Sequence, residues 1–163
     1  SLDLNPSNLF LGHPIINENE SIIVSSNQFT YIVNKLNGSI KYKKNFSSQI
    51  KPIMLNNYLF LITKNNLLIA MDIQKGEIIY STDINQSVAE YLNIKKKKVK
   101  FKNLMISNNK ILIFLENSYV IKFSIMGNIE QVYKLPTKIN SFPIFINSSM
   151  VFLNKKNKVS IID

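Results

Sequence analysis

The sequence predicts an all-β fold built from a repeated unit of four short antiparallel strands, which is the organisation of a β-propeller. Residues 52–72 contain three short apolar runs separated by asparagine-rich turns, and Gly76 leads into a fourth run near Tyr80. Four strands within about thirty residues leave no room for helical crossovers, so neighbouring strands must run antiparallel. Small sheets that repeat every 40–50 residues or so are typical of propeller blades, which bury their faces against one another.

The repeat occurs in four copies that align without gaps. The aligned stretches begin at residues 14, 52, 103 and 143, and each ends twenty residues later, at Asn34, Asp72, Phe123 and Asp163. We therefore expect a single segment, 1–163, with blades at about 14–46, 52–84, 103–135 and 143–163. The last blade is incomplete, because its fourth strand is missing from the sequence. Residues 1–4 or 8–11 are expected to supply that strand, within one chain or between two copies, because an unpaired sheet edge is a liability.

An insert at residues 85–102 interrupts the spacing between the second and third copies. Ser87 and Glu90 form a capping-box pattern, which predicts a short helical turn over residues 88–93, and residues 99–102 alternate like a strand. Four consecutive lysines lie between these two patterns. Repeat proteins often bind partners through such additions, so we expect partner contacts at Tyr91, Lys95, Lys96, Lys97 and Lys98. The alternative is a solvated loop that only joins two blades.

The turn that closes the second copy resembles a family signature. Ala70-x-Asp72-x-x-x-Gly76-x-x-x-Tyr80 is similar to the Ala-x-Asp-x-x-x-Gly-x-x-x-Trp signature of the PQQ-like propellers, with tyrosine in place of tryptophan. A short acid or asparagine can accept backbone N–H bonds, glycine supplies a positive φ, and the ring packs against the next blade. We expect this structural turn role for Asn34, Gly38, Tyr42, Ala70, Asp72, Gly76, Tyr80, Gly127 and Asp163. The third copy is degraded, with Phe123 in the acid position and Gln131 in the ring position.

Composition argues against several kinds of site. The chain has no cysteine, which rules out disulfides and thiolate metal sites, and its one histidine, His13, has no second ligand beside it. Glu18 and Glu20 fall in a predicted turn and are expected to be solvated. The net charge of +10 comes from lysine without any arginine, which argues against nucleic-acid binding. No run approaches the ~20 apolar residues of a membrane span, and no secretory signal precedes Asn5.

The sequence departs from the catalytic branch of the family that it resembles. Quinoprotein dehydrogenases of this family bind pyrroloquinoline quinone and calcium through a cysteine pair, a tryptophan platform and an aspartate base, whereas this sequence has neither cysteine nor tryptophan. We therefore expect no catalytic, cofactor-binding or metal site. The non-catalytic branch includes a propeller lipoprotein of the bacterial outer-membrane β-barrel assembly machinery. It implies a periplasmic, protein-binding scaffold that docks on the barrel-assembly subunit.

The same resemblance leaves two alternatives open. One is a fragment of a PQQ-dependent dehydrogenase, and the other is a cytoplasmic or eukaryotic luminal sensor built on the same repeats. The family implies rings of about seven or eight blades, so the chain is expected to be about half of one. A homodimer that completes the propeller is one way to close the ring.

Overall fold

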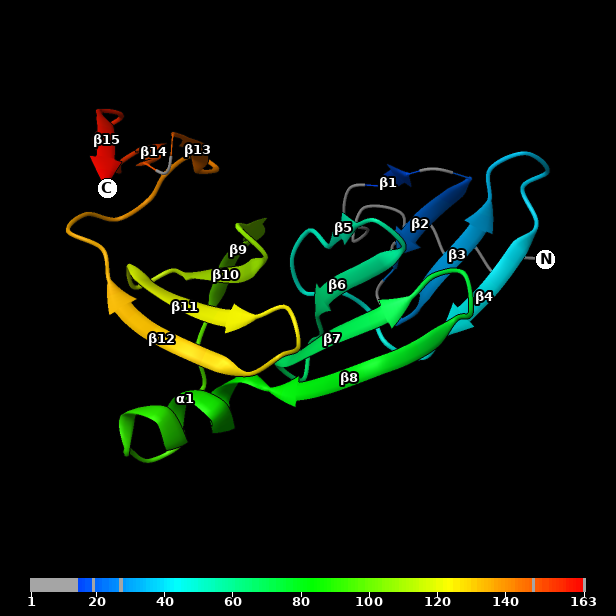
Figure 1. Cartoon of the computed structure of the whole chain (residues 1–163), viewed down its shortest axis with the longest axis horizontal. Helices are drawn as coiled ribbons and strands as arrows, with labels where there is room; N and C mark the ends of the chain where they lie inside the picture. The colour runs from blue at the N-terminus through cyan, green and yellow to red at the C-terminus, as the bar shows by residue number, and fades with distance from the viewer. Residues whose placement is uncertain (1–14, 19, 27, 148, 163) are drawn as a thin grey trace. The chain divides into compact units, whose positions relative to one another are not determined.

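The chain folds as two compact units, Ser1–Ile84 (unit 1) and Asn85–Asp163 (unit 2), each containing two antiparallel sheets (Figure 1). The computed structural model describes residues 15–18, 20–26, 28–147 and 149–162. His13, Asp163 and the proposed strands at residues 1–4 and 8–11 lie outside these ranges. The strands of every sheet are consecutive in the chain, which confirms the prediction of small antiparallel sheets.

Unit 1 contains the first two sheets. The first has the order β1-β2-β3-β4 and consists of β1 (Ile16–Glu18), β2 (Ser21–Ser25), β3 (Thr30–Asn34) and β4 (Ile40–Lys44). The second has the order β5-β6-β7-β8 and consists of β5 (Ile53–Leu55), β6 (Tyr58–Ile62), β7 (Leu67–Asp72) and β8 (Glu77–Asp83). In both sheets the register shifts by one residue between the third and fourth strands, near the glycine turn.

Unit 2 begins with the helix α1 (Ile84–Leu92; Ile84 itself closes unit 1) and contains the third and fourth sheets. The third sheet consists of β9 (Phe101–Ser107), β10 (Lys110–Leu115), β11 (Tyr119–Ser124) and β12 (Ile129–Lys134). The fourth has three strands among the described residues, β13 (Ile144–Ile146), β14 (Ser149–Leu153) and β15 (Val159–Ile162). Among the described residues the fourth sheet therefore has one strand fewer than each of the other three.

Asparagine forms the tight turns between strands. Asn56, Asn108 and Asn147 have positive φ angles (55°, 49° and 47°) in the turns between the first and second strands of their sheets. Asn66 and Asn157 have φ angles of 62° and 56° in the turns that follow the second strand. Asparagine tolerates this left-handed conformation better than other non-glycine residues, so the asparagine-rich turns of the sequence can reverse the chain.

The core of each unit lies between the faces of two successive sheets. In unit 1 the cluster joins Ile23 and Ile32 of the first sheet to residues of β6 and β7, with Leu59, Leu61 and Met71 fully buried. The corresponding cluster of unit 2 contains Leu112, Phe114, Val120, Leu135, Ile139, Met150 and Phe152. Face-to-face packing of neighbouring sheets is the way in which propeller blades bury apolar surface.

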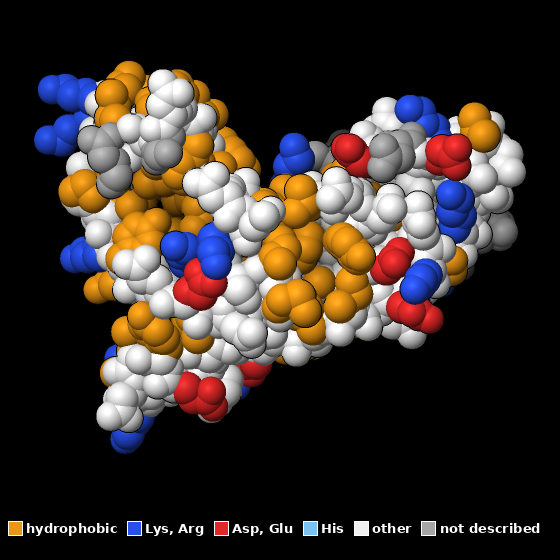
Figure 2. All heavy atoms as spheres, in the orientation of Figure 1, with side chains coloured by type: hydrophobic (Ala, Val, Ile, Leu, Met, Phe, Trp, Pro, Cys, Tyr) orange, Lys and Arg blue, Asp and Glu red, His pale blue; other side chains and the backbone are white. Residues whose placement is uncertain are grey.

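The three-stranded sheet keeps much apolar surface exposed. Val159 and Ile161 of β15 are both 65% exposed, and Ile144 and Ile146 of β13 are about half exposed. Figure 2 shows hydrophobic side chains gathered over this part of unit 2. Large apolar residues exposed together mark a surface that another segment can cover.

Candidate functional site

The glycine turns of unit 1 are closed by a short polar side chain and a glycine. Asn34 Oδ1 accepts a bond from the Leu36 N–H (2.8 Å), and Asp72 Oδ1 accepts one from the Gln74 N–H (2.8 Å). Gly38 and Gly76 follow with φ angles of 71° and 70°, and their N–H groups donate to the carbonyls of Asn34 and Asp72 (2.9 and 2.8 Å). The carboxylate of Asp72 is thus part of a turn.

Tyr42 links the first sheet to the glycine turn of the second. Its hydroxyl donates to the Gln74 carbonyl (2.7 Å), and its ring lies against Gly76, where an added Cβ would come within 2.5 Å of the ring. Gly76 is therefore required for its positive φ and for the close approach of the ring. This contact packs one sheet on the next and leaves no space for a ligand between Tyr42 and Gly76.

The other residues of the expected signature lie in the strands beside these turns or in the corresponding turn of the third sheet. Ala70 is buried in β7 opposite Tyr80 of β8, and burial raises the pKa of Tyr80 to about 12. Gly127 has a φ of 84°, and its N–H donates to the Ser124 carbonyl (3.0 Å). Ser124 Oγ accepts a bond from the Asn128 N–H (3.2 Å), so serine is the side-chain acceptor in this third turn. Sequence reasoning missed this role, because Ser124 lies one residue after the expected acid position.

The insert folds as a helix followed by an exposed lysine segment, residues 95–100. The expected start of the helix at Val88, with Ser87 as its cap, was wrong, because α1 already begins at Ile84, directly after Asp83 at the end of β8. Asp83 is a residue type that favours the N-cap, and two overlapping cap patterns cannot be ranked from sequence alone. The expected strand over 99–102 also starts later, at Phe101.

Asn93 ends α1 in a left-handed conformation, with a φ of 52°. The Asn93 N–H donates to the Glu90 carbonyl (3.2 Å), and the Ile94 N–H donates to the Ala89 carbonyl (2.9 Å). This pair of bonds is a Schellman motif, which stops the helix and turns the chain back. The side chain of Asn85 then holds the returning segment, because its Oδ1 accepts a bond from the Val99 N–H (3.2 Å).

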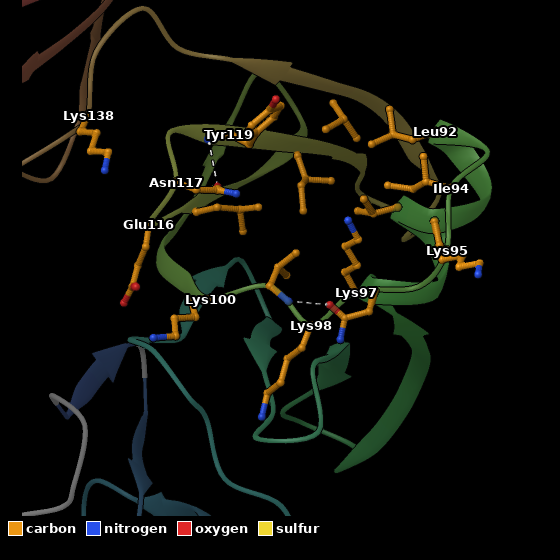
Figure 3. A pocket seen from close by; sticks show the side chains of 17 residues that line it. Leu92, Ile94, Lys95, Lys97, Lys98, Lys100, Glu116, Asn117, Tyr119 and Lys138 are labelled. Carbon is orange, nitrogen blue, oxygen red and sulfur yellow. Dashed lines mark hydrogen bonds between the residues drawn. The ribbon is translucent and has the colours of Figure 1, made fainter.

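α1, the lysine segment and the third sheet enclose a groove of about 680 Å³ (Figure 3). We call it the lysine groove. Its apolar lining comes from α1, from the segment that follows it and from strands β10, β11 and β12, through Val88, Ala89, Leu92, Ile94, Val99, Leu115, Tyr119, Ile121 and Val132. Its charged lining consists of Lys95, Lys97, Lys98, Lys100, Lys138 and Glu116. Figure 3 shows the Lys97 side chain extending toward the middle of the groove.

Three of the five residues expected to contact a partner line this groove, namely Lys95, Lys97 and Lys98. Tyr91 and Lys96 are not among its lining residues, although Tyr91 is 46% exposed. Lys138 lies far along the sequence, and only the folded sheet brings it to the groove. No sequence signal could have indicated it.

A second, smaller hollow of about 430 Å³ lies between the third and fourth sheets. It contains Lys110, Lys122, Tyr133, Phe145 and Met150 among its lining residues. Lys110 forms an ion pair with Glu130, so part of its positive charge is already balanced. Burial raises the pKa of Tyr133, which packs against the core of unit 2. This hollow therefore offers less uncompensated charge than the lysine groove.

The described residues contain no group of three histidine, cysteine or acidic side chains that could hold a metal ion. Over the same ranges, no helix has the length and apolar character that a bilayer crossing requires. Both findings concern only the parts of the chain that the structure describes.

Comparisons with solved structures identify the fold. BamB from Moraxella catarrhalis is similar with a TM-score of 0.70 and 12% identity, over 91% of this chain and 42% of that one. The fold is that of a β-propeller. The computationally designed Ika4 protein matches with a TM-score of 0.65 and 11% identity, over 91% of this chain and 88% of the designed one. Kluyveromyces lactis Hsv2p matches with a TM-score of 0.54 and 18% identity, over 92% of this chain and 46% of that one.

The chain spans less than half the length of BamB. A scan against protein families and a search of curated proteins find no match. At the identities given above, the structural likeness establishes the propeller fold alone.

Proposed function

We propose that this chain is part of a PQQ-like β-propeller that acts as a non-enzymatic protein-interaction scaffold. The observation that carries the proposal is the lysine groove. It forms where an exposed insert projects from the packed β-sheets. Loops and additions held by a rigid scaffold are the usual place for binding residues. The likeness to BamB supports a finer proposal, a periplasmic role in outer-membrane β-barrel assembly with a barrel-assembly subunit as the partner.

The chemistry of the lining favours binding over catalysis. Glu116 is the one carboxylate in the groove, and no histidine or cysteine lines it, so the groove offers no nucleophile with an adjacent base. Asp72, the acid of the family signature, accepts backbone bonds from Gln74 and Lys75 (2.8 and 3.2 Å). The proposal therefore includes no cofactor.

Site-specific photo-crosslinking in the native cells tests the proposed function. A photoreactive amino acid replaces Lys97 in the full-length protein, and a matched variant carries it at Lys156, an exposed lysine that does not line the groove. We expect position 97 to crosslink to an identified barrel-assembly protein and position 156 to give no such product. Equal products from both positions, or no envelope protein at position 97, would contradict the proposal.

We also propose that the fourth sheet is completed by a strand from outside the described ranges, so that two copies can pair into one ring. The support is the three-stranded sheet itself, whose strand β15 leaves Val159 and Ile161 exposed. Light scattering of the purified chain is expected to give the mass of a dimer, and Ile161→Lys is expected to reduce it to that of a monomer. A monomeric mass for the unaltered chain would contradict this pairing.

A further inference from the structure

The lysine groove combines two properties that together specify a ligand. Five lysines line it against a single glutamate, and residues 95–98 of the lysine segment are exposed. An excess of positive groups around one groove attracts a ligand that carries negative charge. The first property therefore selects an anionic ligand.

The second property is apolar surface beside the charge. Leu92 and Ile94 are 40% and 50% exposed, although both are large apolar residues, and both line the groove. Val132 and Tyr119 extend this apolar lining onto the third sheet. A ligand that carries only charge would leave this surface in water, whereas one that also carries apolar groups would bury it.

We infer that the lysine groove binds an acidic peptide segment of a partner protein, with apolar side chains interspersed among its carboxylates. The inference rests on the proposed function, because it names the chemistry of the partner at the same site. A volume of about 680 Å³ lies within the range of roughly 300–1,000 Å³ that is usual for ligand sites. It can hold the anchoring side chains of such a segment while the carboxylates pair with the lysines around them.

The observations favour a peptide over a phosphate-bearing surface. The groove is concave and has an apolar lining, which fits protruding side chains better than the flat face of a bilayer. Phosphate groups are held best by the bidentate arginine fork, and this sequence contains lysine only. An anionic membrane surface is nevertheless a defined outcome of the test below.

Fluorescence anisotropy with a labelled peptide tests the inference. The probe alternates glutamate or aspartate with leucine or isoleucine, and the control probe has glutamine and asparagine in place of the acids. We expect the full chain to bind the acidic probe and to bind the control at least about tenfold more weakly. Raising the salt concentration from about 0.1 M to about 0.5 M should weaken acidic-probe binding further, because salt screens the charges.

Charge reversal locates the binding. The variant Lys97→Glu/Lys98→Glu is expected to weaken acidic-probe binding by roughly ten- to a hundredfold. The matched control Lys156→Glu/Lys158→Glu makes the same change in net charge on exposed lysines outside the groove, and it should leave binding within about twofold. If the groove variant fails to fold, Leu92→Ser/Ile94→Ser gives a second test, with the same expected loss.

The possible results separate the inference from the proposed function. Equal weakening by both charge reversals would overturn the inference, because it would show attraction to net charge alone. Binding to anionic phospholipid vesicles but not to the acidic probe would overturn it in favour of a membrane surface. Crosslinking at position 97 without acidic-probe binding would leave the scaffold function standing and refute the partner chemistry inferred here.

Discussion

Two connections between successive sheets differ in how they are held. The short connection between β4 and β5 is tied to both sheets, because Thr30 Oγ1 donates to the Phe46 carbonyl (2.9 Å), Ser48 N–H to Ser25 Oγ (2.8 Å) and Gln49 N–H to the Ile62 carbonyl (2.6 Å). The long connection between β8 and β9 instead consists of α1 and an exposed lysine segment.

The long connection still ends in the same kind of backbone hydrogen bond as the connection between the third and fourth sheets. The Glu116 N–H donates to the Lys100 carbonyl (3.0 Å), and the Lys155 N–H donates to the Lys138 carbonyl (3.1 Å) in the equivalent place. The extra residues are therefore added ahead of this bond and do not replace it. The residues that tie neighbouring sheets together are thus separate from the exposed residues of the insert, which we propose to bind a partner.

The largest effect is expected where the first and second sheets meet. Gly76→Ala forces an alanine into a left-handed conformation and drives its Cβ into the Tyr42 ring, so we expect a loss of about 2–4 kcal/mol in unfolding free energy. Gly38→Ala is the matched control, because Gly38 has a similar φ and no atom within 4 Å of the added Cβ. It should cost about 1–2 kcal/mol in urea unfolding. Equal losses would show that the Tyr42 contact is unimportant.

The next effect concerns the short connection. Thr30 is fully buried, and Thr30→Val removes its bond to the Phe46 carbonyl, so we expect a loss of about 1–3 kcal/mol in unfolding free energy. Thr137→Val is the control, because the buried Thr137 hydroxyl has no hydrogen-bond partner among the described residues. That change should be neutral or stabilising. A loss at position 137 as large as that at position 30 would contradict this account of the connection.

A pH effect is expected at Tyr80, in the strand that leads into α1. Burial raises its folded pKa to about 12, above the ordinary value near 10, so the folded state holds its proton more tightly than the unfolded chain. The contribution of Tyr80 to stability is therefore fully present below about pH 10 and is lost as the pH rises toward about 12. In thermal melts across this window, Tyr80→Phe should fall less steeply than the unaltered chain. Parallel curves would contradict the raised pKa.

The smallest stability effect is expected in the lysine segment. Lys97→Glu/Lys98→Glu changes exposed side chains of the groove, so the unfolding free energy should stay within about 0.5 kcal/mol of the parent value. Thermal unfolding measures this directly beside Thr30→Val. A loss comparable to that of Thr30→Val would mean that the lysines help to hold the fold, and it would remove the distinction between the two connections.

The fold could be predicted from the sequence because its signals are local and repeated. An apolar run such as residues 60–62 together with Asn56 and Asn66 specifies one strand and the turns on either side of it without any long-range information. The start of the helix in the insert was harder to predict from the sequence. Asp83 and Ser87 both have side chains that can cap a helix, and only tertiary packing selects between them.

The groove could be predicted only in part. The run from Lys95 to Lys98 is visible in the sequence, but Lys138 and Val132 reach the groove through the pairing of β11 with β12 and the chain that follows. The place of Tyr42 against Gly76 likewise depends on how two sheets pack, which periodicity does not specify. Contacts between repeats join residues far apart in the sequence, whereas each repeat is specified by a local sequence pattern.

The central claim is that the lysine groove binds a partner while the short connection only packs sheets together. Hydrogen exchange measured by mass spectrometry tests this claim most directly. Without the probe, the amide of Gln49 should exchange slowly and those of the exposed residues Lys95, Lys97 and Lys98 quickly. Adding the acidic probe should slow exchange in residues 92–100 and 115–119 and leave residues 45–52 unchanged. Protection that appears at residues 45–52, or nowhere in the insert, would contradict the claim that the lysine groove is the binding site of this propeller.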